Sequence, residues 1–510
     1  NAYPLSTVAN PNKEVTRTYY EEQPLALNST IGWEPKDLNT RIGAVAYYES
    51  FDGNQDTYSS ASFYDYDIHG NVRTLLNDNP IMGDFQRYKQ VDYDYDLYSG
   101  KVNEVWYQKS QQDQFAHRYR YDDDNRLVSV ETSRDGILWE EDAEYFYYLT
   151  GALARMELGE DKVQGTDYAY TINGWLKGVN SNTLEARRDM GQDGATLNNK
   201  NKWVAQDAFG FSLTYFNDAT NNEIDYATIA GPTTQDEMWF ATDESAFLPS
   251  TGASLYNGNI RAMVTAIRDK DFELINPLAK VYQYDQLQRI KEAKTYEKVG
   301  VETSNSWANG SFTPAYESSY EFDLNGNLTK LVRNGSGKND QGLTIPYQMD
   351  NFTYYYEDGA GGATTLPTEL NRLFSVKDNI SLSFYNGDIN GGQSSTSANY
   401  TYDEIGRLIA DVDEEIAEIT WTVTNKVAYI KRTAGSTESD VEFKYDALGQ
   451  RIAKIEYTND GTNSINKTYY ARDAQGNVMA TYSQTGTQKI RIIDHELYGA
   501  SRLGVQQVDE

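Results

Sequence analysis

The stretch YDYDIHGNV, residues 64–72, decides the fold of this chain, because variants of it recur almost to the C-terminus. Its pattern is Tyr-x-Tyr-Asp-x-x-Gly-(Asn/Arg)-(Leu/Val). Alternating aromatic residues suit a pleated strand with one buried face. The Asp can bond its own backbone two residues on, and Gly tolerates the positive φ of a reversing chain. Each copy therefore predicts a β-hairpin with a loop of about four residues.

Seven copies of the pattern keep an aromatic residue in the same phase, of which six keep the Asp and five keep the Gly of the turn. We take these repeat residues as structural: Tyr66, Asp67, Gly70, Tyr121, Asp122, Tyr170, Gly174, Tyr284, Asp285, Phe322, Asp323, Gly326, Tyr402, Asp403, Gly406, Tyr445, Asp446 and Gly449. A repeat this frequent indicates an array in which each unit buries its face against the next. We therefore expect an all-β protein in which the hairpins form one long spiralling sheet.

One detail departs from a plain strand. The apolar residues after the turn are spaced i, i+3, as in Val72/Leu75 and Leu127/Val130, where strict alternation gives i, i+2. The flanks are rich in Thr, Val and Tyr, which disfavours a helix. The spacing predicts a β-bulge immediately after each turn.

The repeat resembles that of the bacterial YD-repeat proteins of the Rhs (rearrangement hot spot) family, over roughly residues 41–504. Four longer stretches are similar to one branch of that family: DQFAHRYRYD at 113–122, DYAYTINGWLKG at 167–178, YYARDAQGN at 469–477 and LYGASRLG at 497–504. The resemblance implies that the spiralling sheet is part of a hollow shell.

The resemblance also implies a function that is structural and non-catalytic. The chain would be part of a secreted bacterial shell that encloses, carries or presents a C-terminal cargo, commonly a toxin in similar proteins. Its partners would be the remainder of its own polypeptide, including such a toxin cargo, and secretion or cell-surface proteins. The alternative is a cell-surface adhesin that binds glycans or proteins through its loops. The location expected is secreted or cell surface, and we expect the chain to be an interior portion of a longer protein that lacks the family's core motif.

Composition narrows the partners further. The net charge is −31, from 45 Lys and Arg against 76 Asp and Glu, so nucleic acid and anionic membrane surfaces are poor partners. The absence of cysteine excludes disulfides and thiolate metal sites. No apolar run approaches the roughly 18–20 residues that a membrane-spanning helix needs, so we expect no membrane span in this segment.

The organisation predicted is an extended lead-in at residues 1–40, followed by one continuous repeat region at 41–510. Insertions interrupt the repeat at about 180–255 and 333–399. Residues 180–201 are rich in Asn, Gly and Asp and predict a long loop, with one helical turn at 184–190. Long loops in a regular array are expected to be surface excursions.

The residues that could carry chemistry form no known constellation. The three histidines, His69, His117 and His495, lie in no metal-binding or triad motif. Acids cluster where the repeat itself places Asp, in the solvated turns of an acidic protein. We therefore predict no catalytic, cofactor-binding or metal residue. Bound calcium is the alternative, since residues 323–327 and 459–463 offer oxygen ligands, but neither loop ends in the bidentate Glu of a calcium loop.

The repeat aromatics distinguish the two functions. If the seven rings are buried, they hold neighbouring hairpins together, as a wall requires. If they form an exposed row, they resemble a sugar-stacking platform and favour the adhesin. We expect burial, because an exposed apolar ladder of that length would promote aggregation.

Overall fold

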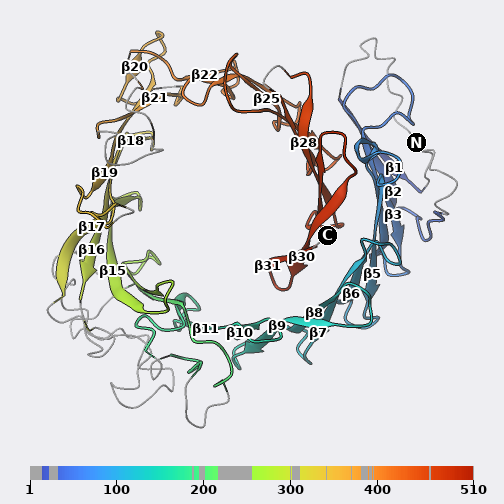
Figure 1. Cartoon of the computed structure of the whole chain (residues 1–510), viewed down its shortest axis with the longest axis horizontal. Helices are drawn as coiled ribbons and strands as arrows, with labels where there is room; N and C mark the ends of the chain where they lie inside the picture. Colours follow the sequence, from blue (N-terminus) through green and yellow to red (C-terminus); the bar gives the residue numbers. More distant parts are fainter. Residues whose placement is uncertain are drawn as a thin grey trace. The chain divides into compact units, whose positions relative to one another are not determined.

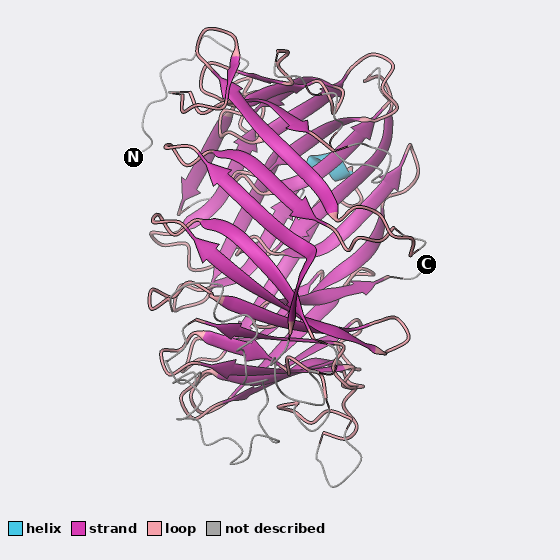
Figure 2. Cartoon of the chain, turned by 90° about the vertical axis from the view of Figure 1, so that its left-hand side faces the viewer, coloured by secondary structure: helices cyan, strands magenta, loops and turns pink. Residues whose placement is uncertain are grey.

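The computed structural model describes residues 14–21, 33–185, 189–194, 201–215, 255–298, 300, 310–339, 342–368, 370–380, 389, 393, 396–458 and 461–508. Strands dominate this described part, which contains one short 3-10 helix, Pro80–Met82, and no α-helix (Figure 2). The predicted all-β class is confirmed. No helix among the described residues is long and apolar enough to cross a membrane.

Most strands pair in antiparallel fashion with the next strand in sequence, as in a meander, whereas β21 pairs with β19. Strands β1 to β21 belong to one 21-stranded sheet and β22 to β31 to a 10-stranded sheet (Figure 1). The chain divides into two compact units, of which unit 1 comprises residues 1–144 and 409–510, and unit 2 comprises residues 145–408.

Unit 1 contains the first and the last strands of the chain. The first are β1 (Val15–Tyr20), β2 (Ile42–Tyr48), β3 (Ser60–Tyr66), β4 (Val72–Asp78), β5 (Tyr88–Tyr95), β6 (Val102–Tyr107), β7 (Phe115–Tyr121), β8 (Leu127–Ser133) and the start of β9 (Glu140–Tyr147). The last are β23 (Leu408–Asp411), β24 (Ile416–Trp421), β25 (Val427–Arg432), β26 (Asp440–Tyr445), β27 (Arg451–Tyr457), β28 (Ser464–Arg472), β29 (Val478–Thr485), β30 (Arg491–Tyr498) and β31 (Arg502–Gln507). Strand β1 lies within the predicted lead-in and pairs with β2.

Unit 2 contains the strands between them. These are β10 (Leu153–Leu158), β11 (Gln164–Tyr170), β12 (Leu176–Val179), β13 (Phe209–Thr214), β14 (Ala262–Arg268), β15 (Leu274–Tyr284), β16 (Ile290–Glu297), β17 (Ser311–Phe322), β18 (Leu328–Asn334), β19 (Gln348–Glu357), β20 (Ala363–Thr364), β21 (Leu373–Asp378) and β22 (Tyr400–Tyr402). Its apolar packing includes a cluster of small and β-branched residues on β14 and β15, with Ala262, Val264, Ala279 and Val281 almost fully buried.

The bulge predicted from the i, i+3 spacing is confirmed. In the first full repeat Tyr66 pairs with Val72, whereas Asp65 pairs with Thr74, so one residue after the turn is left over. The same shift follows the turns that join β7 to β8, β15 to β16 and β17 to β18. Because of this extra residue, the side chains of Val72 and Leu75 lie on the same face of the sheet, and Leu75 pairs with Tyr64.

The prediction that the insertion at 180–255 is a surface excursion is wrong for part of it. Residues 181–184 are buried, so this loop is not a surface excursion over that part. The predicted helical turn at 184–190 is represented by one bond from the Asp189 N–H to the Glu185 carbonyl, at 3.1 Å, and residues 186–188 lie outside the described part. Buried polar groups are tolerated where they have internal partners. The side chains of this loop have such partners, since Asn182 Nδ2 donates to Ser212 Oγ and Asn180 Nδ2 donates to the Phe209 carbonyl.

The two ends of the chain share a core within unit 1, which we call the seam. Its buried members are Leu75, Met82, Val91, Tyr93, Val105, Tyr107 and Phe115 from the N-terminal strands and the 3-10 helix, and Ala453, Tyr469, Ala471, Met479, Ala480 and Tyr482 from the C-terminal strands. Figure 1 shows the red strands β28 and β30 alongside the blue strands β2, β3 and β5. The apolar faces of two separate sheets are thereby removed from water together.

Candidate functional site

The Asp of each repeat turn is bonded by the turn itself. Asp122 Oδ1 accepts from the N–H groups of Asp124 and Arg126 at 3.0 and 2.9 Å, and Arg126 Nε donates to Oδ2 at 2.7 Å. Asp285 repeats these contacts with Leu287 and Arg289. The side-chain bond from Arg126 lowers the pKa of Asp122, and the backbone bond from Arg289 does the same for Asp285.

The turn glycines have the backbone conformation that the repeat predicts. Gly326 and Gly406 have φ of 93° and 90°, which confirms the prediction made for both positions. Gly70, Gly174 and Gly449 are also positive in φ. Two repeats place Asn125 and Gln288 at the equivalent position, with φ of 61° and 62°, so the left-handed conformation belongs to the turn and not to glycine alone.

The second aromatic residue of the repeat connects neighbouring hairpins. Its hydroxyl donates to the carbonyl of the first residue after the preceding turn: Tyr66 to Ile42, Tyr95 to Val72, Tyr121 to Val102, Tyr284 to Ile260, Tyr356 to Leu328, Tyr402 to Leu373 and Tyr445 to Val427, at 2.6–3.1 Å. We call this bond the tyrosine latch. The period of the repeat predicted a shared role for these rings but did not identify this acceptor.

A basic residue of the preceding hairpin makes a second connection. The Arg289 guanidinium lies 4.6 Å from the centre of the Phe322 ring, and Arg372 lies 5.9 Å from that of Tyr402. Arg372 also donates to the Asp403 carbonyl at 3.0 Å. The hairpins of Arg372 and Tyr402 therefore contact each other through a hydroxyl in one direction and a guanidinium in the other.

The seven repeat rings are neither fully buried nor exposed. Tyr66, Tyr121, Tyr170, Tyr284, Phe322, Tyr402 and Tyr445 are all half-buried. A basic side chain lies over four of these rings, those of Tyr66, Tyr121, Phe322 and Tyr402. Six of the seven are tyrosines, five of which have a latch. An open stacking platform needs free ring faces, so this arrangement favours a wall over a sugar platform.

Two turns of the C-terminal sheet differ from the others in the environment of their Asp carboxylates, which are half-buried. Burial raises the pKa of Asp446 and of Asp473, against the hydrogen bonds from their own turns. The Ala474 N–H, beside Asp473, donates to the Tyr93 hydroxyl of β5 at 2.8 Å. The same turn motif therefore serves as a docking contact when it meets another sheet.

The centre of the seam holds a buried polar group. Lys89 Nζ donates to Asp113 Oδ2 at 2.7 Å and lies 4.3 Å from the centre of the Tyr482 ring. Tyr482 also donates to Asp113 Oδ2, and its hydroxyl lies 2.6 Å from that of Tyr107. Burial lowers the pKa of Lys89, whereas the negative charge of Asp113, the carboxylate partner of the ammonium, acts to raise it. Such a paired charge is tolerated inside a protein, whereas a single one is not.

Two of the three histidines meet in the same core, which the sequence analysis did not foresee. The His495 ring stacks on Phe115 at 4.4 Å, and His117 Nε2 donates to the Glu496 carbonyl at 3.1 Å. His117 lies within β7 and is fully buried. Burial lowers the pKa of both imidazoles to about 4. His69 lies in an exposed turn, as predicted.

A second buried polar group lies in unit 2, around Arg155 of β10. Its guanidinium donates to Glu157 Oε1 at 2.8 Å, to Asp167 Oδ2, and to Asp193 Oδ1 at 2.6 Å. Burial raises the pKa of Asp167 to about 7 and that of Asp193 to about 6, although Arg155 opposes both shifts. Burial and the neighbouring Asp189 raise the pKa of Asp207 to about 10.

Only one group of acids in the described part of the chain is arranged to share a metal ion, namely Asp189, Asp193 and Asp207. The calcium loops considered from sequence are arranged differently. Asp323 Oδ1 accepts from the N–H groups of Asn325 and Asn327, and Asn327 Nδ2 donates to Oδ2, so both oxygens are already used. The start of the other loop, residues 459–460, lies outside the described residues.

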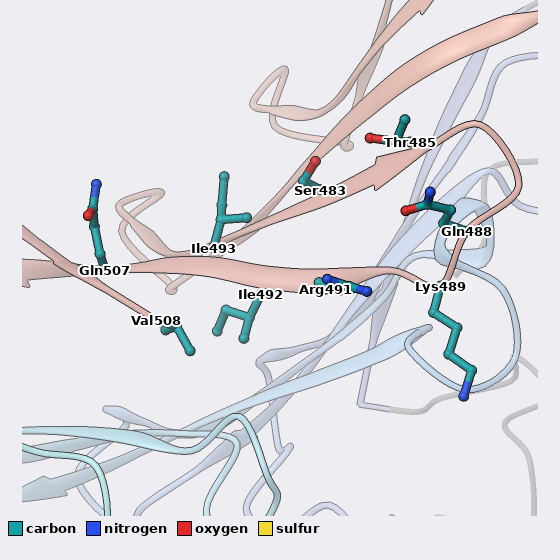
Figure 3. A pocket seen from close by; sticks show the side chains of 9 residues that line it. All are labelled: Ser483, Thr485, Gln488, Lys489, Arg491, Ile492, Ile493, Gln507 and Val508. Carbon is teal, nitrogen blue, oxygen red and sulfur yellow. The ribbon is translucent and has the colours of Figure 1, made fainter. Parts of the chain in front are cut away.

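An open pocket of about 310 Å³ lies at one end of the C-terminal sheet (Figure 3). Its lining comes from β29, β30, the loop between them and the end of β31: Ser483, Thr485, Gln488, Lys489, Arg491, Ile492, Ile493, Gln507 and Val508. The lining contains no carboxylate and no imidazole. This pocket therefore offers no acid–base pair for catalysis.

These features define a class of protein: an all-β meander of Asp-turn hairpins, latched to one another through tyrosine and joined at its two ends. No protein-family profile matches the sequence, and no curated protein matches it. Among solved structures, the chain is similar in fold to TcdB2-TccC3 without its hypervariable C-terminal region, with 11% identity and a TM-score of 0.46 over 98% of this chain. It is also similar to the Photorhabdus luminescens Tc holotoxin pore that carries a mutated TccC3, with 11% identity and a TM-score of 0.41.

The chain spans 23% of the length of each of these two structures. At such identities the likeness concerns the fold alone. The resemblance to the Rhs family therefore stays a prediction, based on the repeat.

Proposed function

We propose that the chain is a structural, non-catalytic wall, part of a secreted bacterial shell that encloses, carries or presents a cargo encoded in the same polypeptide. The observation that carries the proposal is the seam. The chain leaves unit 1 at residue 145 and returns to it at residue 409, and its two ends are then held by one apolar core. A wall that must retain a cargo needs such a joint, because an open meander has two free edges.

The contacts of the repeat support a wall. The latches use the tyrosine hydroxyls on backbone carbonyls of the same chain, and the turn carboxylates are used by their own turns. Groups that recognise a ligand would instead converge on a free surface. The excess of negative charge keeps such a wall soluble and away from anionic surfaces.

The seam gives a direct test on the protein made from the whole reading frame. Asp113→Ala removes the carboxylate that accepts from both Lys89 and Tyr482, and so weakens the seam while leaving the hairpins intact. Limited proteolysis of the wild type should spare the segment that follows residue 510. In the variant that segment should be cut several-fold faster, at unchanged strand content by circular dichroism. The exposed pair Arg120–Glu131 supplies the control, Arg120→Ala, which should behave as the wild type.

Equal cleavage of the wild type and Asp113→Ala would contradict an enclosing wall. Saturable binding of the wild type to a glycan array, with a segment after residue 510 that is open to protease, would favour the adhesin instead.

A further inference from the structure

Three acids of the insertion in unit 2 converge on one point. Asp189 and Asp193 lie in the loop that follows β12, and Asp207 lies just before β13. One carboxylate oxygen from each lies within 4.8 Å of the others, and all three residues are buried. Asp193 and Asp207 are 2% and 6% exposed.

Two carboxylate oxygens of this group have no hydrogen-bond partner. Asp193 Oδ1 accepts from Arg155, and Asp207 Oδ1 accepts from Asn180 Nδ2 at 2.8 Å. Asp193 Oδ2 and Asp207 Oδ2 are buried and have no hydrogen-bond partner. A buried carboxylate oxygen without a partner carries a large desolvation cost, which a cation at the same point would offset.

The third acid is held in position by the loop. Asp189 Oδ2 accepts from the Asp193 N–H at 2.7 Å. Within the described part of the chain, neither Asp189 nor Asp207 forms an ion pair, and the guanidinium of Arg155 is directed to Glu157, Asp167 and Asp193. The two acids therefore face each other without a positive partner.

The backbone is close-packed around Asp193, so this acid cannot easily move away. A Cβ on Gly165 would lie 2.2 Å from Asp193 Oδ2, and one on Gly191 would lie 2.8 Å from Asp193 Oδ1. Asn201 Nδ2 donates to the Gly191 carbonyl at 2.9 Å and fixes the loop from its other side. A preformed set of ligands binds a cation without the cost of ordering them first.

We propose that Asp189, Asp193 and Asp207 bind one hard divalent cation, of the calcium or magnesium class, which locks the insertion between β12 and β13 onto unit 2. The donor set is oxygen only, which suits these ions and disfavours soft metals. Ligands on opposite sides of Ca²⁺ are about 4.6–5.2 Å apart, and those of Mg²⁺ about 4.0–4.2 Å. The span of the three acids accommodates either ion, with calcium the better match to its upper limit.

The competing explanation is a shared proton. A proton between Asp189 and Asp207 would also relieve their repulsion, without any metal. The two explanations differ in what Asp207→Asn does. An amide replaces a protonated carboxyl with little change, but it removes a charged ligand from a cation site.

The first measurement is cation binding by the purified wild type after treatment with EDTA, at pH 7.5. Isothermal titration with Ca²⁺ and separately with Mg²⁺ should show one saturable site per chain. Asp207→Asn and Asp193→Asn should each weaken that site at least tenfold. Asp323→Asn is the matched control, since it neutralises a turn acid whose oxygens are used by its own turn, and it should bind as the wild type does.

The second measurement is thermal unfolding, which does not depend on the variants binding anything. The wild type should gain several degrees in Tm on addition of the better-binding cation. In EDTA, Asp207→Asn should melt at or above the wild type, because it removes repulsion, and added cation should not shift it. The proposal is overturned if native mass spectrometry and titration find no saturable cation on the wild type, or if both Asp variants bind as tightly as Asp323→Asn does.

Discussion

The repeat turns and the insertion after β12 use the same residue, aspartate, in opposite ways. In the turns each carboxylate accepts hydrogen bonds from its own loop, and the pKa of Asp122 and Asp285 is lowered by those bonds. In the insertion the carboxylates of Asp189, Asp193 and Asp207 face one another, and burial raises the pKa of the last two. The first arrangement is complete within one hairpin, whereas the second depends on groups that lie far apart in the sequence.

The turn aspartates find their hydrogen-bond partners within their own loop, whereas the aspartates of the insertion depend on tertiary contacts. A turn Asp should contribute similarly wherever the repeat occurs, because its partners move with it. The acids of the insertion are stable only while Arg155 and the loop backbone remain in place. A substitution should therefore lower the free energy of unfolding modestly in a turn and strongly in the insertion.

The largest effect is expected at Arg155. Arg155→Met keeps much of the side-chain volume but leaves Asp167 and Asp193 buried without their cation. Removing one partner of a buried ion pair costs about 3–5 kcal/mol. Urea unfolding should show a loss of that size, and Arg120→Met, at an exposed pair, should lose less than about 1 kcal/mol. A loss below about 1 kcal/mol in Arg155→Met would show that the insertion does not depend on this guanidinium.

The turns were predictable from sequence and the insertion was not, for a physical reason. Turn chemistry is local, so the position of Asp67 and Gly70 determines the bonds and the φ angle, and the spacing of Val72 and Leu75 determines the bulge. The burial of residues 181–184 depends on partners in β11, β13 and β14, which composition does not reveal. A loop rich in Asn, Asp and Gly has the same composition whether its polar groups bond to water or to buried partners such as Arg155.

The seam escaped prediction for the same reason. Phe115 and His495 are each ordinary strand residues, and no pattern in the sequence indicates that their rings stack. The repeat predicts which face of a strand is apolar, but not which distant sheet covers it. The tyrosine latch was predictable only in part. Its donor, the tyrosine hydroxyl, belongs to the repeat motif, whereas its acceptor is a backbone carbonyl that no residue type marks in the sequence.

Acid should weaken the seam by a predictable amount. His117 has a pKa of about 4 in the folded chain because of burial, below the ordinary value near 6.5. Its unfolded form binds the proton first, so stability falls as pH drops from about 6.5 toward 4. At pH 5 the loss is about 2 kcal/mol for such a histidine. His495, close to Asp113, Arg134 and His117 itself, should contribute in the same direction.

Urea unfolding at a series of pH values measures this effect. His117→Phe removes the titrating group, and the slope of the unfolding free energy between pH 6.5 and 4 should fall by about 1.4 kcal/mol per pH unit. His69, in an exposed turn, gives the control variant His69→Phe, whose slope should equal that of the wild type. An unchanged slope in His117→Phe would mean that this imidazole is charged in the folded protein.

A smaller effect is expected at the turn glycines. Gly406→Val forces a β-branched residue to φ near 90° and should cost about 1–2 kcal/mol through backbone strain. A Cβ at this position would meet nothing closer than 3.8 Å, so the cost is conformational and not steric. Gly406→Asn should lose less, because Asn125 already adopts this conformation in another repeat. Equal losses for Val and Asn, by thermal or urea unfolding, would contradict a conformational origin.

The smallest effect tests the tyrosine latch in both directions. Tyr284→Phe removes the hydroxyl that donates to the Ile260 carbonyl at 2.6 Å and leaves the ring, so it should lose about 0.5–1.5 kcal/mol. Phe322 occupies the same phase without a hydroxyl, and the equivalent acceptor is the carbonyl of Ile290, the first residue after the preceding turn. Phe322→Tyr should therefore gain up to about 1 kcal/mol by completing a missing latch. Urea unfolding of the two variants and of their combination decides the matter. Opposite signs support a latch that acts between neighbouring hairpins, whereas a loss in both would mean that the ring alone, and not its hydroxyl, connects them.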